Sequence, residues 1–232
     1  MDYKRNSRYF HSNDKWYYSG FPIFIVGSSL FACWVIYFDV IPYQAPIGMF
    51  LAIIGAATAF LPYVRCSKES EIDNAIQEIS AAYSKEIDDR LSLKRELKKN
   101  VEPLTIGNYV YEKDLLMRRG RIDRRCRTSM YCISRIFCLN AGIIISQKTF
   151  SLIDETSNER METFAFSDID SVTVIKEPFL CNDQSKIQVS YFVIIKDNAE
   201  LLRLPVKHDV AMDKLCTEIN GMIKYSNCHS CC

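Results

Sequence analysis

The sequence predicts an α+β protein: a two-helix transmembrane hairpin, a long juxtamembrane helix, and then a small antiparallel β-barrel or sheet of seven or eight strands capped by a C-terminal helix. Three observations lead to this class. Two long uncharged runs lie near the N-terminus, a charged segment without glycine or proline follows them, and short β-branched and aromatic runs fill the second half. We expect five segments, at residues 1–20 (leader), 21–65 (hairpin), 66–102 (charged helix), 103–226 (β-rich domain) and 227–232 (cysteine-rich tail).

The two uncharged runs predict helices that cross a membrane. Residues 21–38 are eighteen residues without a charge, residues 40–64 are twenty-five more, and only Asp39 separates them. A spanning helix needs about 20 apolar residues. Aromatic residues at the ends of the runs, such as Trp16 and Tyr63, are typical of the lipid headgroup region. The alternative is a buried helical hairpin in a protein outside the membrane.

The basic residues around the runs predict an orientation. Four Lys or Arg residues lie in the leader and two more follow the second run, whereas the connection between the runs contains none. Because basic flanks favour the cytoplasmic side, we expect an integral membrane protein, in the inner membrane if the cell is bacterial, with both termini in the cytoplasm. The partner expected on this basis is membrane lipid.

Residues 67–100 predict one long charged helix with a narrow apolar stripe. The stripe recurs at spacings of three and four residues, at Ile72, Ile76, Ile79, Tyr83, Ile87 and Leu91. Pro103 follows the segment and is expected to stop the helix. Such a stripe needs a cover, which is either the downstream domain or a second helix. In the second case the chain is a homo-oligomer, or binds a protein partner, through helix 67–100.

The remaining sequence predicts a β-rich domain closed by a helix. Short apolar and aromatic runs separated by turn residues give candidate strands at residues 109–117, 130–138, 143–147, 150–154, 161–166, 172–177, 187–195 and 201–204. Residues 209–225 place Met212, Leu215, Ile219 and Met222 on one helical face, and Asp209 is the candidate N-cap. We therefore expect a curved sheet or barrel plugged by this helix.

Two stretches in this half carry a likeness to a known family. GIIISQKTFSLIDE and METFAFSDIDSVTV, followed by the closing helix, resemble the bacterial pleckstrin-homology-like (PH-like) domains that sit behind paired spanning helices, over about residues 105–225. In that family a strand, a turn and a short "sDI.sv" step cross the middle of the sheet, and residues 143–147, 166–169 and 171–174 match them here. The resemblance implies a binding or sensing fold. It implies no shared ligand, because the arginine cluster and the charged helix are not general features of the family.

Residues 118–127, RRGRIDRRCR, hold six arginines and one aspartate in a chain whose formal net charge is only +1. Arginine binds phosphate through a planar fork, and basic segments are attracted to anionic lipid. Aromatic residues that would stack on bases are missing from the cluster, which disfavours nucleic acid. The alternative is a solvated or internally paired loop. The candidate residues for an anionic ligand or lipid are Arg118, Arg119, Arg121, Arg124, Arg125 and Arg127.

Catalytic and metal chemistry have little support in the sequence. The three histidines are scattered, and no glycine-rich phosphate loop, GxSxG or HExxH motif occurs. Cys132 and Cys138 fall on one face of a candidate strand, where core packing is the ordinary role. Cys228, Cys231 and Cys232 could hold zinc, be acylated or lie in a disordered tail. We predict no catalytic residue, no metal and no cofactor.

These observations predict a non-enzymatic integral membrane protein that displays a cytoplasmic PH-like binding or sensing module, with the arginine cluster contacting anionic lipid or phosphate. One alternative is a membrane effector whose hairpins oligomerise into a pore when the cytoplasmic domain binds a ligand. The other is an enzyme whose site is built from scattered residues.

Overall fold

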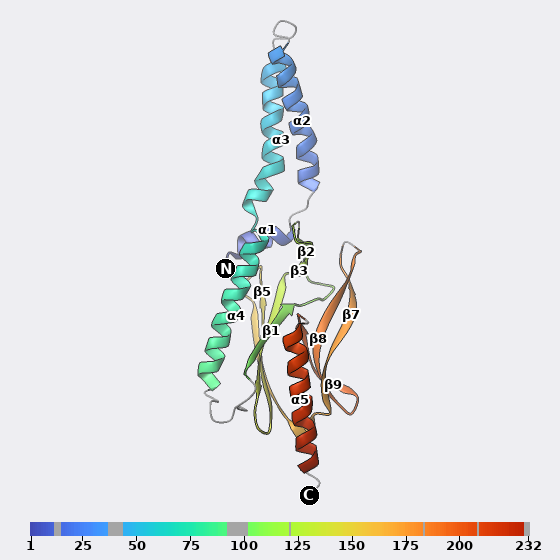
Figure 1. Cartoon of the computed structure of the whole chain (residues 1–232). Helices are drawn as coiled ribbons and strands as arrows, with labels where there is room; N and C mark the ends of the chain where they lie inside the picture. Colours follow the sequence, from blue (N-terminus) through green and yellow to red (C-terminus); the bar gives the residue numbers. More distant parts are fainter. Residues whose placement is uncertain are drawn as a thin grey trace. The chain divides into compact units, whose positions relative to one another are not determined.

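The structure, a computed structural model, describes residues 1–11, 15–36, 44–91, 102–120, 122–182, 184–207 and 209–229 (Figure 1). The chain divides into two compact units, Asp2–Lys68 and Glu69–Cys232. The first unit is helical. The second contains one helix at its start, antiparallel sheets, and one helix at its end. The α+β class predicted from the sequence is confirmed, together with the C-terminal helix.

The first unit contains α1 (Tyr3–His11), α2 (Lys15–Ile36) and α3 (Gln44–Arg65), and α2 packs along α3. Glycines set the distance between these two helices. A Cβ atom on Gly27 would lie 2.3 Å from the backbone nitrogen of Ala52, and one on Gly55 would lie 2.2 Å from that of Phe24. Because the helix backbones are in contact at both points, only glycine fits there.

The predicted membrane hairpin is corrected by the structure. In the described part of the chain, no helix is both long enough and apolar enough to span a bilayer. This finding contradicts the predicted localisation, an integral membrane protein with two spanning helices and cytoplasmic termini. The prediction counted uncharged residues, and α2 and α3 contain many small or weakly polar ones, including Gly, Ser and Thr. An uncharged run is therefore not an equally long apolar run.

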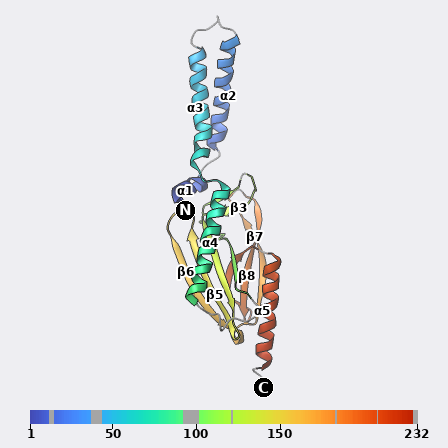
Figure 2. The same cartoon turned by 60° about the vertical axis from the view of Figure 1, so that its left-hand side comes forward.

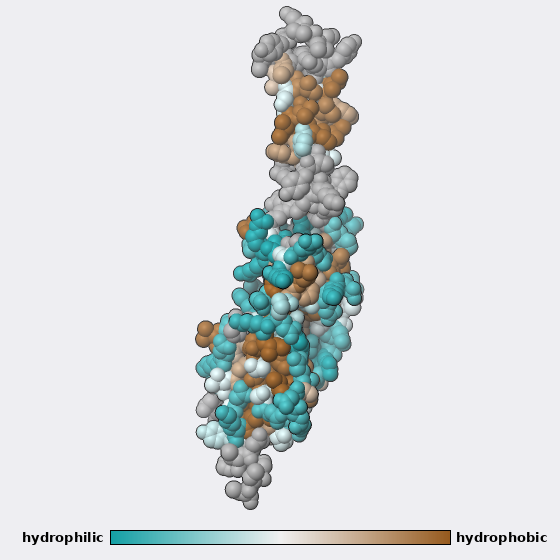
Figure 3. Space-filling view, turned by 90° about the vertical axis from the view of Figure 1, so that its right-hand side faces the viewer, coloured by the Kyte–Doolittle hydropathy of each residue, from teal (hydrophilic) through white to brown (hydrophobic). Residues whose placement is uncertain are grey.

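The hairpin nevertheless exposes apolar side chains, drawn in brown in Figure 3. Phe50 keeps 63% of its surface exposed and Ile53 keeps 59%. The other large apolar residues exposed on α2 and α3 are Phe21, Ile23, Ile25, Val26, Phe31, Val35, Ile47, Met49 and Ile54. Clustered apolar exposure of this kind is characteristic of surfaces that another apolar surface covers.

The second unit begins with α4 (Glu69–Leu91), which buries four residues of the predicted stripe: Ile72, Ile76, Tyr83 and Ile87. Polar contacts fix the helix on the neighbouring sheet. The Tyr83 hydroxyl lies 2.8 Å from the Ser146 hydroxyl, and Arg135 donates to Asp88 at 2.8 Å. The buried part of the stripe is thus covered by the chain's own domain. A partner for helix 67–100 stays a prediction, and residues 92–101 lie outside the described residues.

Two antiparallel sheets and a short hairpin follow. The first sheet has the order β1 (Leu104–Tyr109), β4 (Met130–Cys138), β5 (Gly142–Ser151), β6 (Ser157–Ala165), and the second has the order β7 (Ser171–Leu180), β8 (Lys186–Lys196), β9 (Ala199–Val206). The hairpin of β2 (Met117–Arg119) and β3 (Cys126–Thr128) lies in the chain between β1 and β4. Asn108 joins the sheets by donating to the Val206 carbonyl at 2.9 Å. Asp197 and Asn198, both with positive φ, form the tight turn from β8 to β9.

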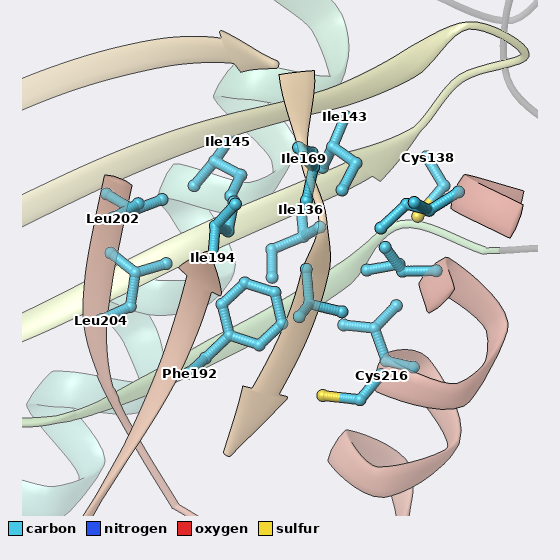
Figure 4. Close-up of a cluster of buried hydrophobic side chains, with 14 of the residues drawn as sticks. Ile136, Cys138, Ile143, Ile145, Ile169, Phe192, Ile194, Leu202, Leu204 and Cys216 are labelled. Atoms are coloured by element: carbon cyan, nitrogen blue, oxygen red, sulfur yellow. The ribbon is translucent and has the colours of Figure 1, made fainter. Parts of the chain in front are cut away.

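The main core lies between these two sheets and α5 (Val210–His229), as Figure 4 shows. Phe192 and Ile194 of β8 point toward Ile136 and Ile145 of the first sheet, and all four are at most 1% exposed. One face of α5 completes the core with Met212, Leu215, Cys216, Ile219, Met222 and Ile223. The Asp209 carboxylate accepts the Met212 N–H at 3.0 Å, which confirms the predicted N-cap.

The first sheet is covered on both faces. Side chains alternate along a strand, so Ile145 faces the main core while Ser146 faces Tyr83 of α4. Figures 1 and 2 accordingly show α4 and α5 along different sides of the sheets. Because β1 of the first sheet meets β9 of the second, β6 and β7 are the strands at the far edges of the two sheets.

Several predicted boundaries were wrong. The candidate strand at 109–117 is replaced by β1, which ends at Tyr109, and by β2, which begins at Met117. The candidate at 143–147 and the first two residues of the candidate at 150–154 belong to one continuous strand, β5, which ends at Ser151, so residues 152–154 lie beyond the strand. Helix α5 extends through His229 and so includes the first three residues of the predicted cysteine-rich tail, whereas residues 230–232 lie outside the described residues.

Candidate functional site

The arginine cluster forms the β2–β3 hairpin and its loop. Arg118 pairs with Arg127 across the two strands, and Arg119 pairs with Cys126. The loop is closed by a 2.8 Å hydrogen bond from the Gly120 N–H to the Arg125 carbonyl. The Asp123 carboxylate accepts the Arg125 N–H at 3.0 Å. The hairpin gives the described arginines of the cluster different environments.

Arg127 is buried, with 1% of its side chain exposed, and it is held by two carboxylates. Its Nη2 donates to Asp73 of α4 at 2.7 Å and to Asp123 of the loop at 2.7 Å. Nε and Nη1 donate to the same two residues at 3.1 Å. The Arg127 guanidinium is therefore neutralised inside the domain. Its contacts with the two carboxylates join α4 to the hairpin. These contacts are the internally paired alternative raised by the sequence.

The ion pair lowers the pKa of the Asp123 carboxyl. The hydrogen bond from Arg127 lowers the pKa of Asp123, and the hydrogen bond from the Arg125 backbone lowers it further. Tyr109 donates to the same Asp73 carboxylate at 3.1 Å, and burial raises the pKa of its phenol well above the usual range. Tyr109, Asp73, Arg127 and Asp123 thus form a network in which one arginine joins two carboxylates and a neutral phenol donates to one of them.

The remaining arginines of the cluster differ in exposure. Arg124 and Arg125 are exposed, and Arg125 keeps 68% of its side chain in solvent although Asp123 lies 3.8 Å away. Arg118 is half-buried, and Arg119 is half-buried and donates to the Ser185 hydroxyl near the start of β8. Arg121 lies outside the described residues. The exposed positive charge is therefore concentrated at the loop end of the hairpin.

A second candidate site, which the sequence did not indicate, lies between β7 and α5. A groove of about 550 Å³ separates the strand from the helix. Strand residues Val172, Thr173, Val174 and Lys176 form one wall, and helix residues Asp213, Cys216, Thr217 and Asn220 form the other. The lining mixes apolar, hydroxyl, amide and charged groups, with Lys176 and Asp213 on opposite walls.

The groove runs along an open strand edge. Within the described residues β7 pairs with β8 on one side only. At the start of the strand, the Asn220 side chain accepts the Val172 N–H at 2.9 Å and donates to the Val172 carbonyl at 2.8 Å. An amide side chain thus pairs with the strand as a neighbouring peptide group would.

The Asn220 contact identifies which backbone groups face the groove. In an antiparallel sheet, alternate residues direct their N–H and C=O to the same side. Since both groups of Val172 point away from β8, those of Val174 and Lys176 do so as well. Pro178, two residues further, has no N–H and ends this series. Between Val172, which Asn220 already occupies, and Pro178, the edge therefore presents two residues, Val174 and Lys176. The backbone N–H and C=O of both residues face the groove.

The cysteine that lines the groove, Cys216, is a poor candidate for a nucleophile. Burial, with a smaller contribution from Asp213, raises the pKa of the Cys216 thiol to about 11. The thiol is therefore protonated near neutral pH and is a poor nucleophile. In the residues that the structure describes, no group of three His, Cys, Asp or Glu side chains is arranged to hold a metal ion.

One sequence signal could have indicated the open edge. A proline inside a strand is tolerated chiefly on edge strands, and Pro178 lies in a segment rich in β-branched and aromatic residues. No feature of the sequence indicated that Asn220 pairs with a strand, because a polar residue on an amphipathic helix ordinarily faces solvent. Its partner Val172 is 48 residues away in the chain.

Comparisons with protein families, with curated proteins and with solved structures gave no match.

Replacing Arg127 with Met tests the structural role of the buried ion pair. The change leaves Asp73 and Asp123 side by side without their shared cation. We expect a loss of roughly 2–3 kcal/mol in the free energy of unfolding, less than the 3–5 kcal/mol typical of a fully buried pair, because the carboxylates are 37% and 30% exposed. Urea unfolding followed by circular dichroism measures this loss. The control Arg125→Met should stay within about 0.5 kcal/mol of wild type, and an equal effect of both variants would contradict the assignment.

The lowered pKa of Asp123 predicts a pH dependence of stability. A carboxyl whose native pKa lies below its unfolded value of about 3.9 stabilises the native state fully above that pH. The contribution is lost as pH falls through the native pKa. The stability difference between wild type and Asp123→Asn should thus be constant at neutral pH and shrink below about pH 4. In the Arg127→Met background this pH dependence should nearly vanish, whereas a difference that grows in acid would contradict the coupling.

Proposed function

We propose that the Glu69–Cys232 unit is a protein-recognition module that binds an extended peptide segment in the β7–α5 groove by strand addition. The observation that carries this proposal is the open edge of β7 beside the groove, with one residue already paired by Asn220. An extended peptide gains affinity from backbone hydrogen bonds to a strand edge and specificity from pockets for alternate side chains. Neither contact requires a catalytic step.

The walls of the groove favour a particular kind of segment. Val174 and Lys176 supply the backbone groups with which an incoming strand would pair. The exposed Lys176 ammonium favours an acidic side chain at one wall, while Asp213 favours a basic or hydroxyl side chain at the other. The short edge accommodates only a few paired residues, so the helix wall at Thr217 and Cys216 has to supply the rest of the contact. A segment with mixed charge and small apolar residues fits these demands.

The resemblance to PH-like domains is part of the same proposal. A four-stranded and a three-stranded antiparallel sheet followed by a closing helix support that resemblance. The strands assigned to it from the sequence correspond to β5 and β7, with the 3₁₀ turn Phe166–Asp168 before β7. The features that favour the proposed peptide are those of the groove, and the resemblance adds no ligand of its own.

The strand-addition proposal predicts the effect of Lys176→Pro. The change removes a groove-facing N–H but leaves the pairing of β7 with β8 intact, because this N–H points away from β8. Peptides of about ten residues, selected against the wild-type chain from a random display library, serve as the probe. We expect about tenfold or greater loss of their affinity, from the lost hydrogen bond and the clash of the proline ring. Fluorescence anisotropy measures it.

Controls separate backbone pairing from other effects. Lys176→Ala keeps the N–H and removes only the charge, so it should weaken binding less than Lys176→Pro. Thr217→Trp, on the groove wall, should block binding, whereas Lys214→Trp, whose side chain is 77% exposed outside the lining, should not. Slower amide exchange at Val174 and Lys176 in the complex is also expected. Selected peptides that bind Lys176→Pro and Thr217→Trp as tightly as wild type would reject the proposal.

A second candidate function rests on the exposed arginines of the β2–β3 loop. Arg124 and Arg125 are exposed beside each other, and a phosphate group is the natural partner for adjacent guanidinium groups. The phosphate could belong to an anionic lipid headgroup or to a free anion. This is the ligand class predicted from the sequence, now restricted to the outer part of the cluster.

Charge removal at the loop tests this second candidate. Each arginine near an anionic surface contributes roughly 1 kcal/mol, so the variant Arg124→Gln, Arg125→Gln should bind phosphatidylserine vesicles about thirtyfold more weakly than wild type at low salt. The difference between anionic and neutral vesicles is the quantity measured, and inorganic pyrophosphate as competitor distinguishes a free anion from a lipid surface. The control Lys214→Gln, Lys224→Gln removes the same charge elsewhere. Equal binding of all three proteins would exclude this candidate.

A further inference from the structure

Two thiols from distant parts of the chain meet beneath the arginine hairpin. Cys126 is the first residue of β3, and Cys181 follows the last residue of β7. Their sulfur atoms lie 3.1 Å apart although 55 positions separate them in the sequence. Both side chains are buried, with 8% and 5% of their surface exposed. A disulfide needs the sulfurs about 1 Å closer, at about 2.05 Å.

The backbone on both sides of the pair is fixed by independent contacts. Cys126 is paired with Arg119 in the hairpin, and its carbonyl accepts the Tyr111 hydroxyl at 2.9 Å. Cys181 lies in a tight turn, in which its N–H donates to the Ser185 carbonyl at 2.9 Å and its carbonyl accepts the Gln184 N–H at 2.9 Å. The close approach of the sulfurs thus follows from the positions of two strands.

Further contacts join the chain around the hairpin to the chain around the end of β7. Arg119 of the hairpin donates to the Ser185 hydroxyl, and the rings of Tyr111 and Phe179 lie 5.6 Å apart. A covalent bond at this point would therefore strengthen a junction that already exists, without a rearrangement of the fold. The neighbouring residues Arg125 and Asn182 are exposed, so the thiols lie just below the surface.

We propose that Cys126 and Cys181 form a reversible disulfide that fastens the β2–β3 hairpin to the end of β7. With a hydroperoxide as the oxidant, one thiolate attacks the O–O bond, which breaks to release an alcohol or water and leave a sulfenic acid. The second thiol then attacks the sulfenic sulfur, the S–O bond breaks, and water leaves as the S–S bond forms. Two thiols are oxidised by two electrons and one hydroperoxide is reduced. A dithiol reverses the bond by exchange.

The bond would close a long loop, and this predicts its measurable consequences. Cross-links between residues far apart in sequence restrict the unfolded chain strongly. The oxidised protein should therefore melt about 5 °C or more above the reduced protein. The arginine loop should also show slower amide exchange after oxidation. The inference is independent of the proposed peptide site, since it rests on other residues.

Peptide mapping of the full chain tests the proposal. The protein is treated with hydrogen peroxide at low molar excess, the remaining thiols are alkylated in denaturant, and the digest is analysed by mass spectrometry. We expect one linked peptide that joins Cys126 to Cys181, two hydrogens lighter than the sum of its reduced parts. Dithiothreitol should remove the link and return the melting temperature to its reduced value. Separately alkylated or sulfinylated Cys126 and Cys181 would overturn the proposal.

Variants provide the matched controls. Cys126→Ser and Cys181→Ser should each abolish both the linked peptide and the rise in melting temperature. Cys132→Ser should abolish neither, because that buried thiol accepts a hydrogen bond from Gln147 and lies in β4. The wild-type mapping does not depend on whether a serine variant folds. A link that forms only between two molecules, or one that leaves the melting temperature unchanged, would also contradict the fastening of the hairpin.

Discussion

Burial of one face of α5 between the two sheets is the contact on which the Glu69–Cys232 unit depends. Leu215, Ile219 and Ile223 of the helix are at most 4% exposed, and they meet Phe192 and Ile194 of β8 in one core. Each such side chain contributes about 1.5–3 kcal/mol when it leaves water. The sheets are joined to each other mainly along β1 and β9. Without the helix, the opposite side of the core would be open to solvent.

The same contact explains why a groove lies beside β7. A helix that covers an open corner of two sheets has to lie close to an outer strand, but its side chains prevent it from pairing with that strand. The Asn220 side chain satisfies the strand edge at one residue, because it pairs with both the N–H and the C=O of Val172. Further along, the groove lies between the strand and the helix, and the backbone groups of Val174 and Lys176 face it. The open edge of β7 is thus a consequence of how the core is closed.

Helices could be predicted from the spacing of nearby apolar residues. The predictions failed where the role of a residue depends on a contact with a distant part of the chain. The apolar spacing in 67–100 and 209–225 identified α4 and α5 correctly. Strand β1 was missed because Gly107 and Asn108 are typical turn residues. Gly107 is needed there, since a Cβ would lie 2.8 Å from the Cys132 carbonyl oxygen. The false break in β5 arose at Lys148, a polar residue whose ammonium lies over the Tyr83 ring of α4.

The arginine cluster shows the same limit for the candidate site. Local sequence gives a segment with six cations and one anion, but it does not give Asp73, which lies 54 positions before Arg127. Asp73 and Asp123 together carry one more charge than the arginine between them. Arg127 is therefore neutralised within the domain, and the exposed arginines in the described part of the cluster are Arg124 and Arg125. The charge of Arg127 thus stabilises the junction with α4, whereas the proposed peptide site at the edge of β7 offers the backbone groups of Val174 and Lys176.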